Sequence, residues 1–267
     1  MDLHRIRTII DKEWAEVFKN RMVIVTLAVL PVVFTLLPLV ILYAMHTSGG
    51  LPSGVNAGAD VPANFQALCG GQPAGDCMQI YIMTEFLMMF MMMPLIMPTA
   101  FAAYSIVGEK TTRSLEPLLA TPITTPELLA GKSLAAVIPA IALSWLSFGV
   151  FLLCLPLVGA TPGLIRYTTG PVWLLAVLVI GPLLAIASVN LAVIVSSRVN
   201  DPRAAEQIAG VLIVPVLLVL FGQLAGLFIL NAALMSVAIV VLLLVDVALI
   251  YAGAQLFQRE TILTRWK

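Results

Sequence analysis

The sequence predicts an all-α, polytopic membrane protein. We expect a helical bundle of six transmembrane helices with an N-terminal in-plane amphipathic helix and both termini in the cytoplasm. Hydrophobic residues make up 61% of the 267 residues, charged residues make up 10%, and the mean hydropathy is +1.05. A water-soluble domain of this length does not have such a composition. The period-2 alternation of a membrane β-barrel is missing, so helices are predicted.

Residues 1–267 are expected to form a single transmembrane domain, because six apolar segments leave little chain for anything else. Crossing a hydrocarbon core of roughly 30 Å takes about 20 apolar helical residues. The segments that reach this length, and are therefore predicted to span the membrane, are 22–45, 80–107, 133–158, 172–195, 208–230 and 234–257.

The positions of the basic residues predict the orientation. Five of the 14 Lys and Arg precede the first span, three lie in 108–132, two in 196–207 and three in the C-terminal tail. Only Arg166 falls on the other side. Because basic residues accumulate in cytoplasmic loops, this distribution predicts cytoplasmic termini. The first span is too long for a cleaved signal peptide and is expected to remain in the mature chain.

Residues 1–21 have the pattern of an amphipathic helix. Apolar residues recur at spacings of three and four, and charged residues take the other face. The predicted apolar face is Leu3, Ile6, Ile10, Trp14, Val17 and Phe18, and the charged face is Arg5, Arg7, Asp11, Lys12, Glu16 and Lys19. Two roles fit this helix: an anchor that sets the entry angle of the first span, or a lever that links a cytoplasmic partner to the bundle.

The outer segment 46–79 contains Cys69 and Cys77 but no basic residue. An oxidising exterior would allow these two cysteines to form a disulfide that constrains the loop, with free thiols or metal ligands as alternatives. Cys154 lies inside the third span, where a small packing residue is expected.

The cytoplasmic loop 108–132 is the most polar internal stretch, with three basic and three acidic residues around a leucine stripe. This pattern favours a short helix that docks on a soluble partner. Pro122 should end that helix. A second helix then begins either with Thr124 as cap and Glu127 at its third position, or with Thr125 as cap before Pro126.

The smaller loop 196–207 repeats this arrangement. Asp201 supplies a cap, Pro202 fits the first helical turn, and the helix is expected to continue into the fifth span.

Polar residues with carboxyl or amide groups inside the predicted spans include Glu85, Asn190, Gln223 and Asp246. A carboxyl group there should face protein or water or be protonated, so Glu85 and Asp246 have either a structural role or a role in handling protons or substrate. Asn190 and Gln223 are expected to form hydrogen bonds between helices.

The second span is rich in methionine, and Met89, Met93 and Met97 share one face. Thioethers can bind Cu(I), but adaptable apolar packing is the commoner use, and no metal site is predicted.

The loop 108–132 carries a resemblance to a known family. Its Gly-Glu-Lys, Leu-Glu-x-Leu-Leu-Ala-x-Pro and Glu-Leu-Leu-x-Gly-Lys motifs, with Lys12-Glu13 and Asn20-Arg21 near the N-terminus, resemble a permease of the type-2 ABC exporter family. Arg203-Ala-Ala-Glu-Gln207 adds weaker support.

The resemblance implies a dimer, made with a second copy or a homologous permease, above separate ATP-binding subunits that hold ATP and Mg²⁺. No cofactor is then expected on this chain. The implied ATPase-coupling residues are Gly108, Glu109, Lys110, Arg113, Leu115, Glu116, Leu118, Leu119 and Arg203. It also implies multi-pass insertion in the plasma (inner) membrane of a prokaryote, with lipid rather than nucleic acid as a further partner.

In such permeases the second and fifth spans line the pathway, which implies Met89, Met93, Met97 and Gln223 as pathway residues. A methionine-lined wall suits a lipophilic or amphipathic cargo. Gly222 and Gly226, a small-x-x-x-small pattern, fit either ordinary packing or the dimer seam.

The chain is not expected to be an enzyme. Gly131-Lys132-Ser133 imitates the end of a phosphate-binding loop, but the required earlier glycine is replaced by Pro126. Two functions of other classes stay open, a proton-coupled secondary transporter and a non-transporting membrane scaffold.

Overall fold

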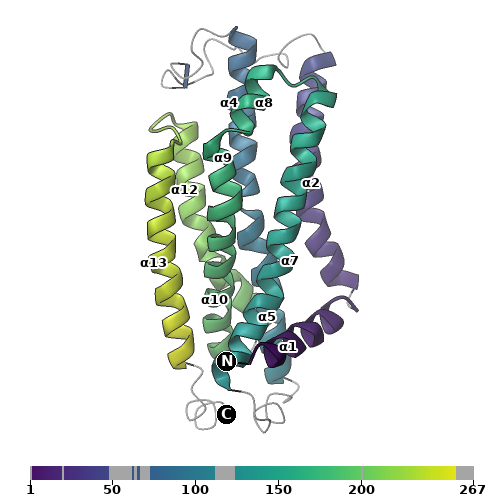
Figure 1. The fold of residues 1–267 in the computed structure, drawn as a ribbon, viewed down its shortest axis with the longest axis vertical. Helices are drawn as coiled ribbons and strands as arrows, with labels where there is room; N and C mark the ends of the chain where they lie inside the picture. Colours follow the sequence, from purple (N-terminus) through teal and green to yellow (C-terminus); the bar gives the residue numbers. More distant parts are fainter. Residues whose placement is uncertain are drawn as a thin grey trace.

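A computed structural model describes residues 2–19, 21–47, 62, 65–66, 73–111, 124–199 and 201–256. Within these residues the secondary structure is helical throughout, and the long helices run side by side as an elongated bundle (Figure 1). Six of the described segments are long and apolar enough to cross a membrane, which confirms the predicted polytopic helical bundle. The elements are α1 (Leu3–Val17), α2 (Arg21–Thr47), α4 (Ala74–Phe90), α5 (Met93–Thr111), α7 (Thr125–Cys154), η1 (Leu155–Val158), α8 (Pro162–Thr168), α9 (Pro171–Leu175), η2 (Ala176–Ile180), α10 (Gly181–Arg198), α11 (Pro202–Ala209), η3 (Gly210–Leu212), α12 (Ile213–Leu224) and α13 (Ala232–Leu256).

Helix α1 crosses one end of the bundle, which we call the α1 end (Figure 1). Its buried face is Ile6, Ile9, Glu13 and Val17, and this face packs on α7. The face differs from the sequence expectation, because Leu3 is 82% exposed and Phe18 is 53% exposed. The buried stripe is thus rotated toward Ile9 and Glu13, since α7 rather than a flat membrane surface selects the residues it covers.

The second span is broken in its middle. Helix α4 ends at Phe90, and α5 begins at Met93 after a turn in which the Met91 and Met92 N–H groups donate to residues three positions earlier. Pro94 has no N–H to donate to the Phe90 carbonyl, which accounts for the interruption. The span is nevertheless the centre of the molecule, because 72% of its apolar 18-residue stretch is buried inside the chain.

The fourth span contains a π-helical turn, η2, between α9 and α10. In a π-helix each carbonyl accepts from the N–H five residues later. The carbonyl of Val177 would therefore accept from residue 182, which is a proline and has no N–H. The indole N–H of Trp145, on α7, donates to the Val177 carbonyl instead, at 3.0 Å. A neighbouring helix thus satisfies a backbone group that would otherwise be unpaired inside the membrane.

The fifth span is shorter than predicted, because α12 ends at Leu224 rather than near residue 230. Gly226 has φ +68°, its N–H donates to the Gln223 carbonyl, and the N–H of Leu227 donates to the Gly222 carbonyl. This pattern is a Schellman motif, which requires a residue in the left-handed conformation and favours glycine there. Gly226 is therefore a helix stop in this structure, and Gly222 is covered by the ring of Phe228 in the same chain.

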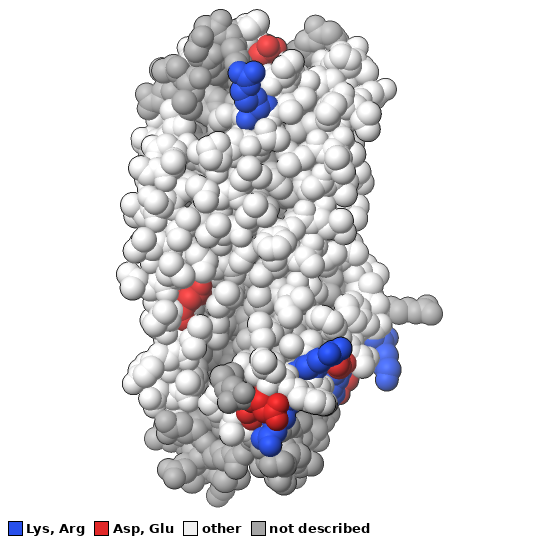
Figure 2. All heavy atoms as spheres, viewed as in Figure 1, with Lys and Arg blue, Asp and Glu red and all other residues white. Residues whose placement is uncertain are grey.

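Charged side chains gather at the two ends of the bundle (Figure 2). Between them lies a broad surface without charges apart from a small acidic area. In the apolar 18-residue stretches of the sixth and fifth spans only 11% and 17% of the residues are buried, so both spans present most of their apolar surface outward. An apolar band between charged ends is the surface expected of a chain surrounded by lipid.

Candidate functional site

The candidate site is the base of the polar loop at the α1 end. Helix α5 leads into the loop and ends at Thr111, and α7 leaves it with Thr124 as N-cap. Gly108, Glu109 and Lys110 lie at the end of α5, where the structure describes only their backbone. The other predicted coupling residues of this loop lie outside the described residues: Arg113, Leu115, Glu116, Leu118 and Leu119.

The start of α7 is tied to the start of α1 through one carboxylate. Glu127 Oε2 accepts from the backbone N–H of Thr124 at 3.0 Å, as expected for a capping box. The other oxygen accepts from the backbone N–H of Asp2 at 2.8 Å. Arg5 Nη1 lies 3.7 Å from Oε2. Of the two start positions that the sequence left open, the structure has Thr124 as the cap.

A second contact joins α1 to α7 two turns further along. Trp14 Nε1 donates to the carbonyl of Ala135 at 2.9 Å. That carbonyl has no helical donor, because the residue four positions later is Pro139. The indole therefore fills a hydrogen-bonding position that the proline leaves open.

Close packing brings the two helices together between these contacts. A Cβ at Gly131 would lie 2.8 Å from Ile9 Cγ2 and 2.9 Å from Ile9 Cβ. No side chain fits there without displacing α1. Glycine at this position in α7 thus sets how closely α1 approaches the third span.

Three polar side chains from three helices form a closed set of hydrogen bonds beside this contact. Lys132 Nζ on α7 lies 2.7 Å from Glu13 Oε1 on α1 and 2.8 Å from Ser105 Oγ on α5. Ser105 Oγ donates to Glu13 Oε2 at 2.6 Å. The Lys132 and Glu13 side chains are only 5% and 3% exposed, so the ion pair is buried.

Glu13, Ser105 and Lys132 are not among the functional residues predicted from the sequence. A signal was nevertheless present, because Glu13 occupies a helical position in line with Ile6, Ile9 and Val17. A charged residue on a buried stripe needs a partner of opposite charge. The sequence could not show that this partner is Lys132, which is 119 positions away.

Arg203 belongs to the same end of the molecule. It lies exposed in the first turn of α11, and its backbone N–H donates to Asp201 Oδ1 at 3.0 Å. Asp201 is the N-cap and Pro202 lies in the first turn, as the sequence predicted. Because α11 packs on α5, the smaller loop 196–207 and the polar loop adjoin neighbouring helices.

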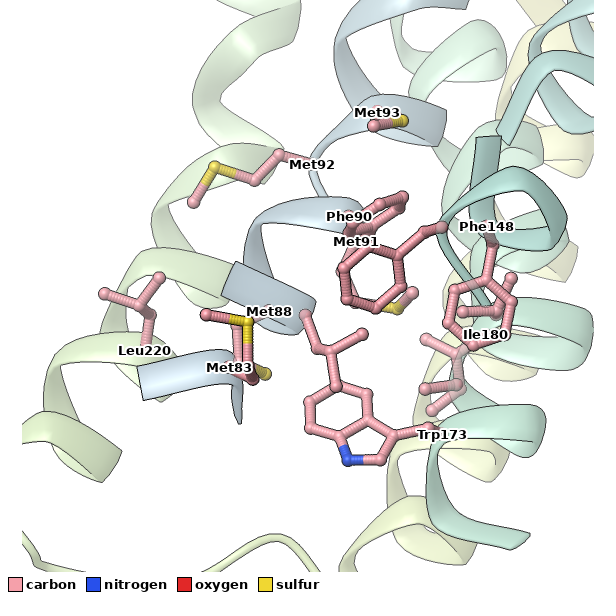
Figure 3. Packing of buried hydrophobic residues seen from close by; sticks show 14 of the residues in the cluster. Met83, Met88, Phe90, Met91, Met92, Met93, Phe148, Trp173, Ile180 and Leu220 are labelled. Atoms are coloured by element: carbon pink, nitrogen blue, oxygen red, sulfur yellow. The ribbon is translucent and has the colours of Figure 1, made fainter. Parts of the chain in front are cut away.

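The predicted pathway residues lie mainly inside the chain. Met93 is 0% exposed, Met97 is 3% exposed, Gln223 is 2% exposed, and Met89 is partly buried. Figure 3 shows the neighbouring methionines of the α4–α5 break packed among aromatic and aliphatic side chains from other helices of the same chain. In this conformation they do not form a surface that a second copy could meet, and the pathway assignment stays a prediction.

The intramembrane polar residues are poorly paired. Both carboxylate oxygens of Glu85 and of Asp246, and both amide atoms of Gln223, are buried without a hydrogen-bond partner among the described residues. Asn190 Nδ2 donates at 2.8 Å to the Ile186 carbonyl of its own helix. The expected bond between helices is therefore replaced by a bond within α10.

At the opposite end, Cys77 is disulfide-bonded and Cys154 is a free cysteine. Cys69 lies outside the described residues, so its pairing with Cys77 stays a prediction.

Comparison with known proteins supplies the identity that the geometry alone does not. The family described as "ABC-2 family transporter protein" matches residues 7–252, which include the first five described spans and most of the sixth, Ala232–Leu256. No curated protein matches the chain. Because the matched region covers nearly the whole sequence, the chain belongs to the ABC-2 transporter family.

Proposed function

We propose that this chain is the permease subunit of an ATP-driven exporter, working as a dimer above two copies of a separate ATP-binding subunit. The observation that carries the proposal is the family match over residues 7–252, because members of this family are membrane components of ABC transporters. In the proposal, ATP and Mg²⁺ bind the partner subunit, and this chain binds no cofactor. The cargo is lipophilic or amphipathic, and the host membrane is the plasma (inner) membrane of a prokaryote.

The distribution of charge supports a cytoplasmic position for the α1 end. Arg5, Arg7, Lys12 and Arg203 belong to that end, whereas Arg166 belongs to α8 at the opposite end. Because positive charge concentrates on the cytoplasmic side, the polar loop would face the compartment that contains ATP.

The base of the polar loop supports a docking role. Helices α1, α5 and α7 meet there through buried polar contacts and a close helix approach. The helices that carry the polar loop are thus held together where they enter the membrane domain. Displacement of a docked subunit would then reach the second and third spans directly.

Charge reversal in the loop tests this assignment. Glu109→Lys together with Glu116→Lys should abolish co-purification of an ATP-hydrolysing subunit with the affinity-tagged chain, while membrane insertion is unchanged. A matched control is Asp11→Lys with Glu16→Lys, which reverses two exposed acidic residues of α1. If the loop variant retains the ATPase at normal affinity, the docking assignment is wrong.

The pathway part of the proposal requires a second conformation. Met89, Met93, Met97 and Gln223 must become accessible when the spans move, since Met93, Met97 and Gln223 are at most 3% exposed in this conformation. Single cysteines at Met93 and Gln223, in a chain whose free Cys154 is replaced, can be labelled with a membrane-impermeant thiol reagent. Labelling that changes with nucleotide supports a gated pathway, whereas protection in every state assigns these residues to packing.

A second candidate, proton-coupled transport, is favoured by one observation. Glu85 and Asp246 are acidic residues inside spans without hydrogen-bond partners among the described residues, and such residues often handle protons. Glu85→Gln with Asp246→Asn discriminates the two functions. Transport that continues with ATP in this variant supports the exporter. Transport by the wild-type chain alone under a pH gradient, lost in this variant, supports the second candidate.

A further inference from the structure

The buried set of Glu13, Ser105 and Lys132 is placed where a mechanical link would be needed. Ser105 lies about two turns before the end of α5 at Thr111, and Lys132 lies about two turns after the start of α7. These two helices are the stems through which the polar loop joins the membrane domain. Glu13 contributes the third helix, α1, and both its carboxylate oxygens are used, one for each stem.

The chemistry of this set indicates that it fixes the arrangement of the three helices more than it stabilises the fold. A buried ion pair is seldom more stabilising than a well-packed apolar pair of similar volume, because removing both charges from water is costly. Its geometry, however, is demanding, since short directional bonds fix both partners. Glu13, Ser105 and Lys132 are joined by three bonds of 2.6–2.8 Å. Such a set specifies one arrangement of the three helices and penalises others strongly.

Other α1–α7 contacts restrict the same movement. The Trp14 bond to Ala135, the Ile9 contact at Gly131 and the Asp2 bond to Glu127 lie along one side of α7. Among the polar contacts of α1 with described residues, only the Glu13 set also includes α5. Among the described residues of α1, Glu13 is therefore the one whose side chain bonds to both stems, α5 and α7.

We propose that Glu13, Ser105 and Lys132 form a clamp that holds α1 and the two loop stems as one rigid unit, and that this unit stays closed while nucleotide-driven displacement passes from the loop to the spans. The three residues are positioning residues for coupling. This inference rests on the proposed function, in which a separate subunit supplies the displacement. It assigns the role of lever to the unit as a whole rather than to α1 alone.

Distances between spin labels test whether the unit is rigid. One label pair replaces Arg7 on α1 and Leu134 on α7, and reports movement within the unit. Another replaces Arg7 and Gln207 on α11, and reports movement of the unit against the rest of the bundle. Each label pair is measured with and without a non-hydrolysable ATP analogue, in the purified complex with Cys154 replaced.

The clamp predicts different behaviour for the two pairs. In the wild type the Arg7–Leu134 distribution should be narrow and independent of nucleotide, while the Arg7–Gln207 distance shifts. A nucleotide-dependent change between Arg7 and Leu134 would mean that the unit opens, and would overturn the proposal.

An apolar replacement separates positioning from stability. Glu13→Leu with Lys132→Met removes both charges of the buried ion pair, so the complex should assemble and melt near the wild-type temperature. The Arg7–Leu134 distribution should nevertheless broaden, and the Arg7–Gln207 shift should be lost. Ser105→Ala should produce a smaller broadening. If the apolar double variant retains both wild-type distributions, the set is only packing and the proposal fails.

The exposed pair Lys12–Glu16 is a matched control on the same helix. Its atoms lie 3.6 Å apart, its side chains are 40% and 58% exposed, and its two residues belong to α1. Lys12→Met with Glu16→Leu should leave both label distances unchanged, and an equal effect of this control would also contradict the clamp.

Different results would contradict the proposed function and the clamp. If no ATP-binding subunit assembles with the wild type, the proposed function is wrong, and the Arg7–Leu134 distribution of the chain by itself still decides whether the clamp makes a rigid unit. If the complex assembles and the apolar variant transmits nucleotide binding normally, the function stands and the clamp is refuted.

Discussion

The indole N–H of Trp14 donates to the carbonyl of Ala135, the backbone group in α7 that Pro139 leaves without a helical donor. A side chain on the transverse helix thus completes the hydrogen bonding of a span. The same principle recurs between Trp145 and Val177, and more weakly between Ser188 and the Pro94 carbonyl that Pro98 cannot reach, at 3.4 Å. Prolines inside these spans are consequently sites where helices are joined to one another.

Trp14→Phe should destabilise the fold by about 1–3 kcal/mol, because an acceptor remains buried without its donor. Pro139→Ala restores an N–H for Ala135, so Trp14→Phe should cost clearly less in that background. Free energies of unfolding in micelles, measured as a double-mutant cycle, give the coupling between the two sites. Trp145→Phe is the control, since its bond to Val177 should be independent of residue 139; strictly additive effects of Trp14→Phe and Pro139→Ala would contradict this relationship.

Gly131→Ala should displace α1 from α7 and cost about 1–3 kcal/mol, because its Cβ would lie 2.8 Å from Ile9 Cγ2. Gly149→Ala is a matched control in the same helix, where a Cβ meets no atom within 4 Å. That change should be neutral or stabilising by up to about 1 kcal/mol. Limited trypsin digestion at Arg5, Arg7 and Lys12 can report release of α1, and equal digestion of both variants would argue against the close contact.

Asp201→Ala should destabilise the start of α11 by about 1 kcal/mol, because Asp201 Oδ1 accepts the Arg203 N–H at 3.0 Å. Asp201→Asn keeps an acceptor oxygen and should behave like the wild type. Hydrogen exchange of the amides in the first turn of α11 measures the effect. Unchanged exchange in the alanine variant would show that the cap contributes nothing there.

Cys77 should be recovered in a peptide disulfide-linked to Cys69 when the chain is digested under non-reducing conditions and analysed by mass spectrometry. The expectation combines the bonded state of Cys77 with the free state of Cys154 in a chain with three cysteines. Cys77→Ser should free the Cys69 thiol for labelling from outside without altering ATPase docking at the other end. A Cys77 linked to a second copy of the chain would contradict the predicted pairing.

Sequence by itself determined the features that depend on local composition. Six spans follow from hydropathy, because leaving an apolar segment of about 20 residues in water is too costly whatever its neighbours are. The cap Asp201 could likewise be predicted, and the cap of α7 could be narrowed to Thr124 or Thr125, since a cap bonds to groups only two or three residues away.

Tertiary structure alone decided which residues meet. Hydropathy places Glu13 and Lys132 near the membrane surface but does not pair them across 119 residues, and helical periodicity puts Met93 and Met97 on one face without saying what covers it. The rotated face of α1 and the satisfied carbonyl of the π-helical turn at Ala176–Ile180 also depend on neighbouring helices. The physical reason is that apolar burial has no direction, whereas hydrogen bonds and close contacts do, and these are completed only when the helices pack.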